Sequence, residues 1–163
     1  MVAFVSLRVR GAVLFCPRGE DKRAMDRRLT FLTAFLGFTG VGLGALGAHA
    51  VKGVVLDLPD AAQRLGWWET AARYHLVHAL AVGLVAVLSA HVTSQFPRWA
   101  AGLFTLGIVL FSGSLYVMTL TGLRTLGMVT PFGGLSFLAG WVALALGARG
   151  LGRQKEAPRP GEP

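Results

Sequence analysis

Residues 74–97 read YHLVHALAVGLVAVLSAHVTSQFP, a run of 24 residues between Arg73 and Arg98 without Asp, Glu, Lys or Arg. Three more uncharged runs of 23 to 25 residues lie at 29–51, 99–123 and 125–148. A helix needs about 20 apolar residues to cross a hydrocarbon core of about 30 Å. The runs do not alternate apolar and polar residues, and an open sheet cannot leave its edge in lipid. The sequence therefore predicts an all-α bundle of four transmembrane helices.

The composition fits one membrane-embedded domain. Of the 163 residues, 53% are hydrophobic and only 15% are charged, whereas soluble domains are about 25% charged. The net charge of +8 comes from basic residues near the two ends of the chain. Membrane orientation explains that placement better than nucleic-acid binding, so no nucleic-acid partner is predicted. The single cysteine, Cys16, excludes an internal disulfide and a cysteine-based metal framework.

The chain divides into a basic extension, a membrane domain and a tail. The membrane domain is predicted at 29–148, with spans at about 29–51, 74–92, 99–120 and 129–148. The basic extension at 1–28 has two interpretations, because Met25 stands just ahead of the first span. It is either an artefact of an upstream start site or a tail lying on the cytoplasmic leaflet. The proline-containing, basic stretch at 149–163 is predicted to be a disordered cytoplasmic tail.

A short interfacial helix is expected between the first two spans. Asp60 is a candidate N-cap for the segment that follows it. Glu69 and Arg73 are four residues apart and would form a favourable helical ion pair. The segment also carries aromatic side chains of the kind found at the lipid headgroup boundary: Trp67, Trp68 and Tyr74. We expect this helix to lie at the membrane surface and to bend into the second span.

Four spans place both chain ends on one side of the membrane. Twelve of the sixteen basic residues would then lie on the side of the termini, and four would lie on the other side. The positive-inside rule predicts that both termini are cytoplasmic, in a multi-pass protein of the cell (inner) membrane.

Four strings of residues carry a resemblance to a known family. They read GALGAHA (44–50), WETAARYHLVHAL (68–80), FSGSLY (111–116) and LGMVTPFGGLSFLAGW (126–141). In this order and spacing they resemble the small membrane proteins grouped as domain of unknown function 423, which include the transmembrane protein 256-like proteins. The resemblance covers about Thr30–Leu146 and implies a four-span helical membrane protein without assigned catalytic residues. The extension before Met25 departs from the family pattern.

The candidate ligand residues are three histidines and one acid. His49 closes the first span, while His75 and His78 open the second and lie three residues apart on one helix face. If the first two spans are antiparallel neighbours, the three imidazoles reach the same outer level, with Glu69 near them. Such a set could hold a divalent metal ion, and two imidazoles on facing helices could hold haem. The simpler interpretation is that these histidines bond to backbone carbonyls or to Ser and Tyr on the third span.

The third and fourth spans carry further polar and small residues. Ser112, Ser114 and Tyr116 are predicted to be hydrogen-bonding groups between helices, because no base or oxyanion hole accompanies the serines. Small residues suit close approach of helices at two places: Gly40, Gly44 and Ala48 in the first span, and Gly133, Gly134 and Gly140 in the fourth.

Three functions follow from these features. The first is a non-enzymatic membrane protein that acts through helix packing or contacts with a partner, either a second copy or another membrane protein. The second is an oligomeric pathway for protons or a small solute, since four spans enclose little volume on their own. The third is a metal- or haem-binding protein that uses His49, His75 and His78. No catalytic residue and no cofactor is predicted, and the lipid bilayer is the expected surrounding.

Overall fold

The computed structural model describes residues 8–9, 12–13, 18–89 and 95–149. Within these residues, four helices are long and apolar enough to cross a membrane: Arg27–Val55, Ala61–Ser89, Phe96–Thr121 and Arg124–Ala148. The predicted all-α fold with four spans is confirmed. Of the extension predicted at 1–28, residues 1–7, 10–11 and 14–17 lie outside the described residues, and residues 18–28 belong to the first helix. The tail predicted at 149–163 lies outside the described residues except for Arg149.

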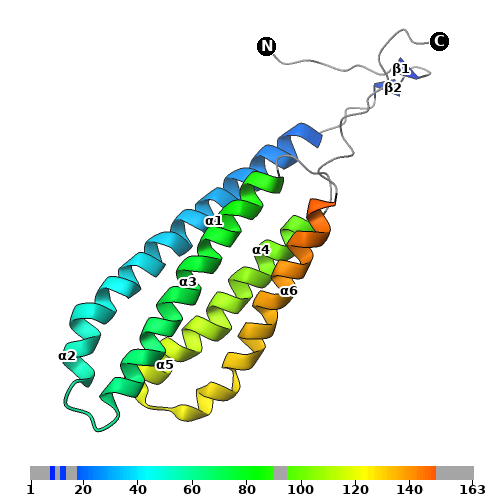
Figure 1. Ribbon diagram of the computed structural model, residues 1–163. Coiled ribbons are helices and arrows are strands. Elements are labelled where there is room, and N and C mark those ends of the chain that lie inside the picture. Colours follow the sequence, from blue (N-terminus) through cyan, green and yellow to red (C-terminus); the bar gives the residue numbers. More distant parts are fainter. Residues whose placement is uncertain (1–7, 10–11, 14–17, 90–94, 150–163) are drawn as a thin grey trace.

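Three of the four spans are built from more than one helical element, and Figure 1 labels their α-helices. The first contains α1 (Arg18–Leu46), the five-residue π-helix η1 (Gly47–Val51) and α2 (Lys52–Val55). The second is α3 (Ala61–Ser89) alone. The third contains α4 (Phe96–Gly107), the π-helix η2 (Ile108–Ser112) and α5 (Gly113–Thr121). The fourth joins the 3-10 helix η3 (Arg124–Met128) to α6 (Thr130–Ala148). The strands among the described residues, β1 (Arg8–Val9) and β2 (Ala12–Val13), form one short antiparallel pair.

Local sequence explains where several helices begin and end. Pro97 and Pro131 lie in the first turns of α4 and α6, where a missing backbone N–H breaks no helical hydrogen bond. α5 ends at Gly122, whose φ of 74° is the left-handed conformation that glycine adopts without strain. The chain therefore turns sharply directly after α5.

The helices do not close into a ring. α1 packs along α3, α3 packs along α4 and α5, and α4 packs along α6 (Figure 1). Among the described residues, α1 has no extensive contact with α4 or α6. Only 17% of the apolar window of the first span is buried, against 44%, 50% and 33% for the next three. The first span is thus an edge helix held by one neighbour.

Two apolar clusters form the core. The larger lies where α3 and α4 meet α1 and α6, and its centre includes Val82, Val85 and Phe104. The smaller lies toward the α2–α3 connection and is built around Trp68 and Tyr116, whose ring centroids are 4.6 Å apart in an edge-to-face pair.

Glycines allow two of the closest helix contacts, and the prediction for them was partly right. A Cβ on Gly133 would collide with the backbone of Phe111, and a Cβ on Gly140 would collide with the Phe104 ring. Gly134, in contrast, has only the edge of the Phe111 ring at 3.9 Å. In the first span, Gly40 meets Leu76, whereas a Cβ on Gly44 would meet nothing within 4 Å. Gly134 and Gly44 were therefore wrongly expected in tight contacts.

The separate interfacial helix is also a wrong prediction. α3 runs without interruption from Ala61 to Ser89, so the segment around Trp68 belongs to the second span itself. Trp68 is 4% exposed, and its indole N–H donates to the Leu43 carbonyl at 2.8 Å. This side chain is a core residue that fastens α3 to α1, and the packing keeps the first turns of α3 in line with the rest.

Asp60 directly precedes α3, and its carbonyl accepts the Arg64 amide at 3.0 Å. Its carboxylate, however, is taken by two guanidinium groups, with the Arg64 Nε at 2.8 Å and an Arg124 nitrogen at 3.3 Å. These are the ion pairs among the described residues, and the expected Glu69–Arg73 pair is not one of them.

Candidate functional site

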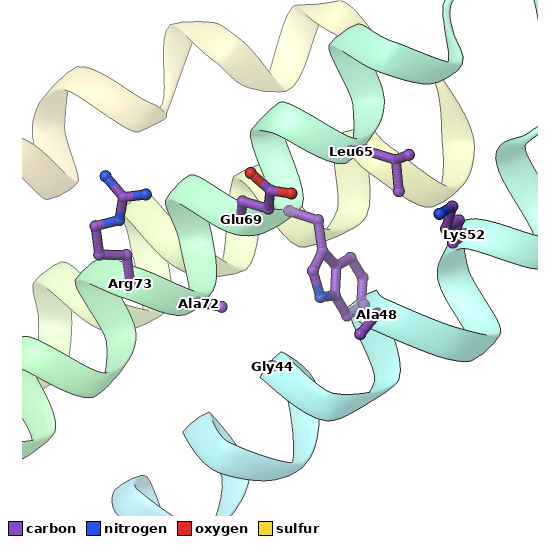
Figure 2. A pocket seen from close by; sticks show the side chains of 9 residues that line it. Gly44, Ala48, Lys52, Leu65, Glu69, Ala72 and Arg73 are labelled. Carbon is purple, nitrogen blue, oxygen red and sulfur yellow. The ribbon is translucent and has the colours of Figure 1, made fainter.

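A groove lies between the end of the first span and the first turns of α3 (Figure 2). Its volume is about 500 Å³. Its lining comes from α1, η1 and α2 on one side and from α3 on the other: Gly44, Gly47, Ala48, Lys52, Leu65, Trp68, Glu69, Ala72 and Arg73. The wall from the first span consists mainly of residues with little or no side chain, which is why the two helices leave space there.

Trp68 forms the rigid floor of this groove. Its ring lies so close to Gly47 that any Cβ at that position would collide with the indole. The hydrogen bond to Leu43 and the edge-to-face contact with Tyr116 fix the ring from two further sides. The groove is therefore built by the same tryptophan that the sequence suggested as a surface anchor.

Three charged side chains lie along the groove. Lys52, Glu69 and Arg73 are exposed, and none has an ion-pair partner within the described part of the chain. In Figure 2, the Glu69 carboxylate lies between the Arg73 guanidinium and Lys52. Two cations and one anion thus face a single hollow of polar and small residues.

The three histidines do not come together. His49 is exposed in η1, whereas His75 and His78 are buried in α3. His75 faces α1, where its Nε2 is 3.4 Å from the Thr39 hydroxyl. His49 is ten residues beyond Thr39, or about 15 Å along a helix with a rise of 1.5 Å per residue. The expected common level was therefore wrong.

His78 faces the opposite side of the bundle. Its ring stacks on Phe137 of α6, with centroids 3.5 Å apart. Its Nδ1 lies 2.8 Å from the Tyr74 carbonyl, and the Trp141 indole N–H donates to its Nε2 at 3.3 Å. This network assigns the hydrogen to Nδ1, where it donates to the carbonyl, and leaves Nε2 as the acceptor. Both nitrogens of His78 are thus used inside the bundle.

The described residues contain no group of three or more His, Cys, Asp or Glu side chains that could hold a metal ion. The physical reason is local. A spacing of three residues separates two side chains on a helix enough for different neighbouring helices to receive them. Here α1 receives His75 and α6 receives His78, while Glu69 lies in the groove.

The predicted polar residues of the third span have two different environments. Ser114 donates to the Phe111 carbonyl at 2.9 Å and lies 2.8 Å from the Thr130 hydroxyl of α6. The Ser112 hydroxyl, the Tyr116 hydroxyl and the His75 Nδ1 are buried and have no hydrogen-bond partner in the described part of the chain. Ser112 and Tyr116 are four residues apart and therefore lie on the same helix face. The centroid of the Tyr116 ring lies 6.3 Å from that of the His75 ring.

Several polar contacts between helices were not predicted. Arg64 and Thr119 exchange two hydrogen bonds: Nη1 donates to the Thr119 carbonyl at 3.1 Å, and the Thr119 hydroxyl donates to the Arg64 carbonyl at 3.0 Å. The Ser136 hydroxyl donates to the Leu103 carbonyl at 2.8 Å. Isolated Thr and Ser residues inside apolar runs could have indicated polar contacts between helices. The sequence does not identify their partners, because these depend on which helices are neighbours.

Comparison with known proteins agrees with this architecture. Residues 43–134 match the family described as "Protein of unknown function (DUF423)". The chain is 42% identical over 115 residues to the UPF0382 membrane protein SH2409 of Staphylococcus haemolyticus, covering 71% of this chain and 89% of that protein. It is 41% identical over 130 residues to the UPF0382 inner membrane protein YgdD of Escherichia coli, covering 79% and 95%. The UPF0382 membrane protein YwdK of Bacillus subtilis is 40% identical over 118 residues, covering 72% and 92%.

No solved structure matches the chain. The family match extends over more than half of the sequence, and each of these relatives is named a membrane protein. The four apolar helices agree with those names. The resemblance found in the sequence is confirmed: the chain is a membrane protein that belongs to the DUF423 (UPF0382) family.

Proposed function

We propose that this protein is not an enzyme, and that it acts through helix contacts inside the membrane, with a second copy of the chain as its partner. The observation that carries this proposal is the edge position of the first span. The apolar window of that span is 17% buried, and within the described part of the chain the span packs extensively on α3 alone. An edge helix of this kind has a free face on which another transmembrane helix can pack.

The glycines of α1 support the proposal. Glycine within a helix is about 1 kcal/mol less favourable than alanine, so it is usually retained for close approach. Gly40 and Gly47 allow the contact with α3, but a Cβ on Gly37 would meet nothing within 4 Å. Val41, one turn later, is 62% exposed. Two α1 helices related by a two-fold axis would meet through this same patch on both chains.

The polar side chains of the spans also favour a structural role over catalysis. The hydroxyls of Ser114, Thr119 and Ser136 each donate to a backbone carbonyl. Ser114 also contacts the Thr130 hydroxyl, and the Thr119 hydroxyl lies within hydrogen-bonding distance of a second carbonyl, that of Leu115. Bonds of this kind hold transmembrane helices together. His78 likewise uses both ring nitrogens within the bundle.

Cysteine cross-linking in membranes tests the proposal. In a chain whose native Cys16 has been replaced by alanine, Val41→Cys should give a covalent dimer with a short bifunctional maleimide. Val142→Cys in α6 is the matched control, because Val142 is 60% exposed and Val41 is 62% exposed. Equal cross-linking at the two positions, or none at Val41→Cys, would contradict a specific α1 contact.

The oligomeric pathway for protons or a small solute is the second candidate. It is favoured by buried polar atoms of His75, Ser112 and Tyr116 that have no hydrogen-bond partner among the described residues. Water could join them into a chain, since intramembrane polar groups often mark such pathways. Reconstituted vesicles loaded with a pH-sensitive dye should then equilibrate faster than empty ones, and Tyr116→Phe should slow them while Tyr74→Phe should not. The metal- or haem-binding alternative is not proposed, because its candidate ligands lie apart.

We also propose that both termini are cytoplasmic. Lys52, Arg64 and Arg124 all belong to the α2–α3 and α5–α6 ends of the helices. These three are the minority of the sixteen basic residues, which supports an external location for that end under the positive-inside rule. A fluorescent reporter fused after Arg149 should be active, and an active phosphatase fused at the same place would refute the orientation.

A further inference from the structure

We propose that Glu69 and Arg73 lie within the hydrocarbon of the membrane on the lipid-facing side of α3, and that a second copy of the chain pairs with both. The Glu69 carboxylate of each copy binds the partner's Arg73 guanidinium, so two ion pairs form across one two-fold axis. This inference rests on the proposed function, because it names the charged side chains through which the two copies recognise each other.

Three of the four spans agree on where the middle of the membrane lies. The uncharged runs of the first, third and fourth spans are centred on Gly40, Phe111 and about Phe137. All three residues lie beside one short stretch of α3. A Cβ on Gly40 would lie 2.9 Å from the Leu76 side chain. The Phe111 and Phe137 rings have centroids 4.6 Å and 6.0 Å from that of Tyr74. The middle of the membrane therefore crosses α3 near Tyr74.

This level places Glu69 and Arg73 inside the hydrocarbon. Arg73 directly precedes Tyr74, and Glu69 is five residues away from it, or about 8 Å along the helix. The hydrocarbon extends about 15 Å to either side of its middle. Arg64 is about 15 Å from the same level and bonds to Thr119 near the end of α5, so it lies at the edge of the hydrocarbon.

Both side chains also face out of the bundle. They belong to a stripe of exposed residues that recurs every three or four positions along α3: Gly66, Glu69, Arg73, Val77, Leu80, Leu84 and Val87. The other members are apolar or have no side chain, as expected of a surface in contact with lipid. A charged side chain within the hydrocarbon is costly and is almost always paired with another polar group. This face of α3 therefore needs a partner that carries charge.

One copy of the chain does not satisfy these two charges. Glu69 and Arg73 have the spacing of a helical ion pair, yet no such pair is present among the described residues. A guanidinium has five N–H donors and a carboxylate has about four acceptor sites, whereas one two-pronged contact between them uses only two of each. A second copy carries the same two groups on the same face and supplies the donors and acceptors that remain.

The geometry of the membrane allows this pairing. Two copies that insert in the same orientation are related by a two-fold axis along the membrane normal, so their α3 helices are parallel. Glu69 and the partner's Arg73 then differ in depth by about 6 Å. Side chains on a helix lean toward its N-terminus, so Arg73 leans toward the level of Glu69. The long arginine side chain can therefore cover the difference.

The first span leaves room for the partner's side chains. Gly44 and Ala48 form the opposite wall of the groove that Glu69 and Arg73 line (Figure 2). A Cβ on Gly44 would meet nothing within 4 Å, so this wall is low. Gly37 and Val41 continue the same stripe at spacings of three or four residues. The proposed contact patch of α1 and the charged face of α3 thus form one continuous surface.

Co-expression of two differently tagged copies tests the proposal. One copy carries Glu69→Gln and the other carries Arg73→Gln. Each homodimer then lacks both ion pairs, whereas the mixed dimer keeps one, between Arg73 of the first copy and Glu69 of the second. Native mass spectrometry in a mild detergent measures all three dimers. Random pairing gives twice as much mixed dimer as either homodimer. We expect a ratio of at least about 10, since a hydrogen bond to a charged group is worth about ten-fold or more in affinity.

The control is a second co-expressed pair, Asp57→Asn with Arg98→Gln, which makes the same changes in charge at exposed side chains outside the uncharged runs. This pair should give a ratio near 2. A ratio near 2 for the Glu69 and Arg73 variants would overturn the proposal, and so would an equal enrichment in the control, because net charge would then explain it. If either variant does not accumulate alone, both should accumulate when expressed together, and failure to do so would also refute the pairing.

The unaltered chain separates this inference from the proposed function. If it forms dimers and cross-links at Val41→Cys while the mixed dimer shows no enrichment, the α1 contact stands and only the charge pairing fails. If it forms no dimer, the proposed function fails and the pairing fails with it.

Discussion

The two adjacent glycines of α6 give a sharp test of the packing. Gly133→Ala places a methyl group against the backbone of Phe111 in η2, with the nearest side-chain carbon at 2.7 Å. An ordinary contact begins at about 3.4 Å and the Phe111 backbone nitrogen is nearer still, so α6 and η2 must move apart by at least about 0.7 Å. Neither partner is a flexible side-chain end, and overpacking of this kind destabilises by about 1–3 kcal/mol.

Gly134→Ala is the control, because the added methyl group meets only the Phe111 ring edge at the ordinary distance of 3.9 Å. Alanine favours a helix over glycine by up to about 1 kcal/mol, so this variant should be neutral or slightly more stable. The assay is the free energy of unfolding in mixed micelles, titrated with a denaturing detergent, together with the melting temperature. Equal effects of the two substitutions would refute the assigned helix contact, whatever their size.

Three further predictions concern buried and interfacial polar groups. Ser112→Ala should raise the unfolding free energy by about 1 kcal/mol, because it removes a fully buried hydroxyl that has no partner among the described residues. A loss of stability would instead indicate ordered water and favour the pathway function. Trp68→Phe should destabilise by about 1–2 kcal/mol in the same assay, since the bond to Leu43 is lost and part of a buried ring is removed, and an unchanged stability would contradict its core position. The Arg64 guanidinium, which donates to the Asp60 carboxylate, holds the pKa of that carboxyl below its ordinary value. The stabilisation is therefore fully present above about pH 4 and is lost as the pH falls through the lowered pKa. Asp60→Asn should flatten this acid-side decline in melting temperature, and an identical decline in both proteins would refute the linkage.

The spans were predictable because burial in hydrocarbon excludes charge, and four uncharged runs therefore mark four helices. The helix ends were less predictable. α1 begins at Arg18 and not at residue 29, and α3 begins at Ala61 and not at residue 74. A helix satisfies its own backbone hydrogen bonds and can continue into the polar layer. The point where charged residues begin is therefore not the end of the helix.

The candidate site was less predictable than the fold. Periodicity alone placed His75 and His78 on one face, but α3 lies between α1 on one side and α4 and α6 on the other, and the two rings pack in opposite directions. Trp68 looked like a boundary aromatic because it stands beside Trp67 and near charged residues. Its burial depends on Gly47, which is 21 positions away in the sequence. Contacts of this kind become predictable only when the pairing of the helices is known.

The reciprocal bonds between Arg64 and Thr119 have a practical consequence for anyone who wishes to attach a label or insert a tag. Both bonds join the start of α3 to the end of α5, and Asp60 binds the same guanidinium. An insertion or a bulky label at Asp60, Arg64 or Thr119 would separate these partners. Epitopes, purification handles and fluorophores are therefore better carried by the far end of the molecule.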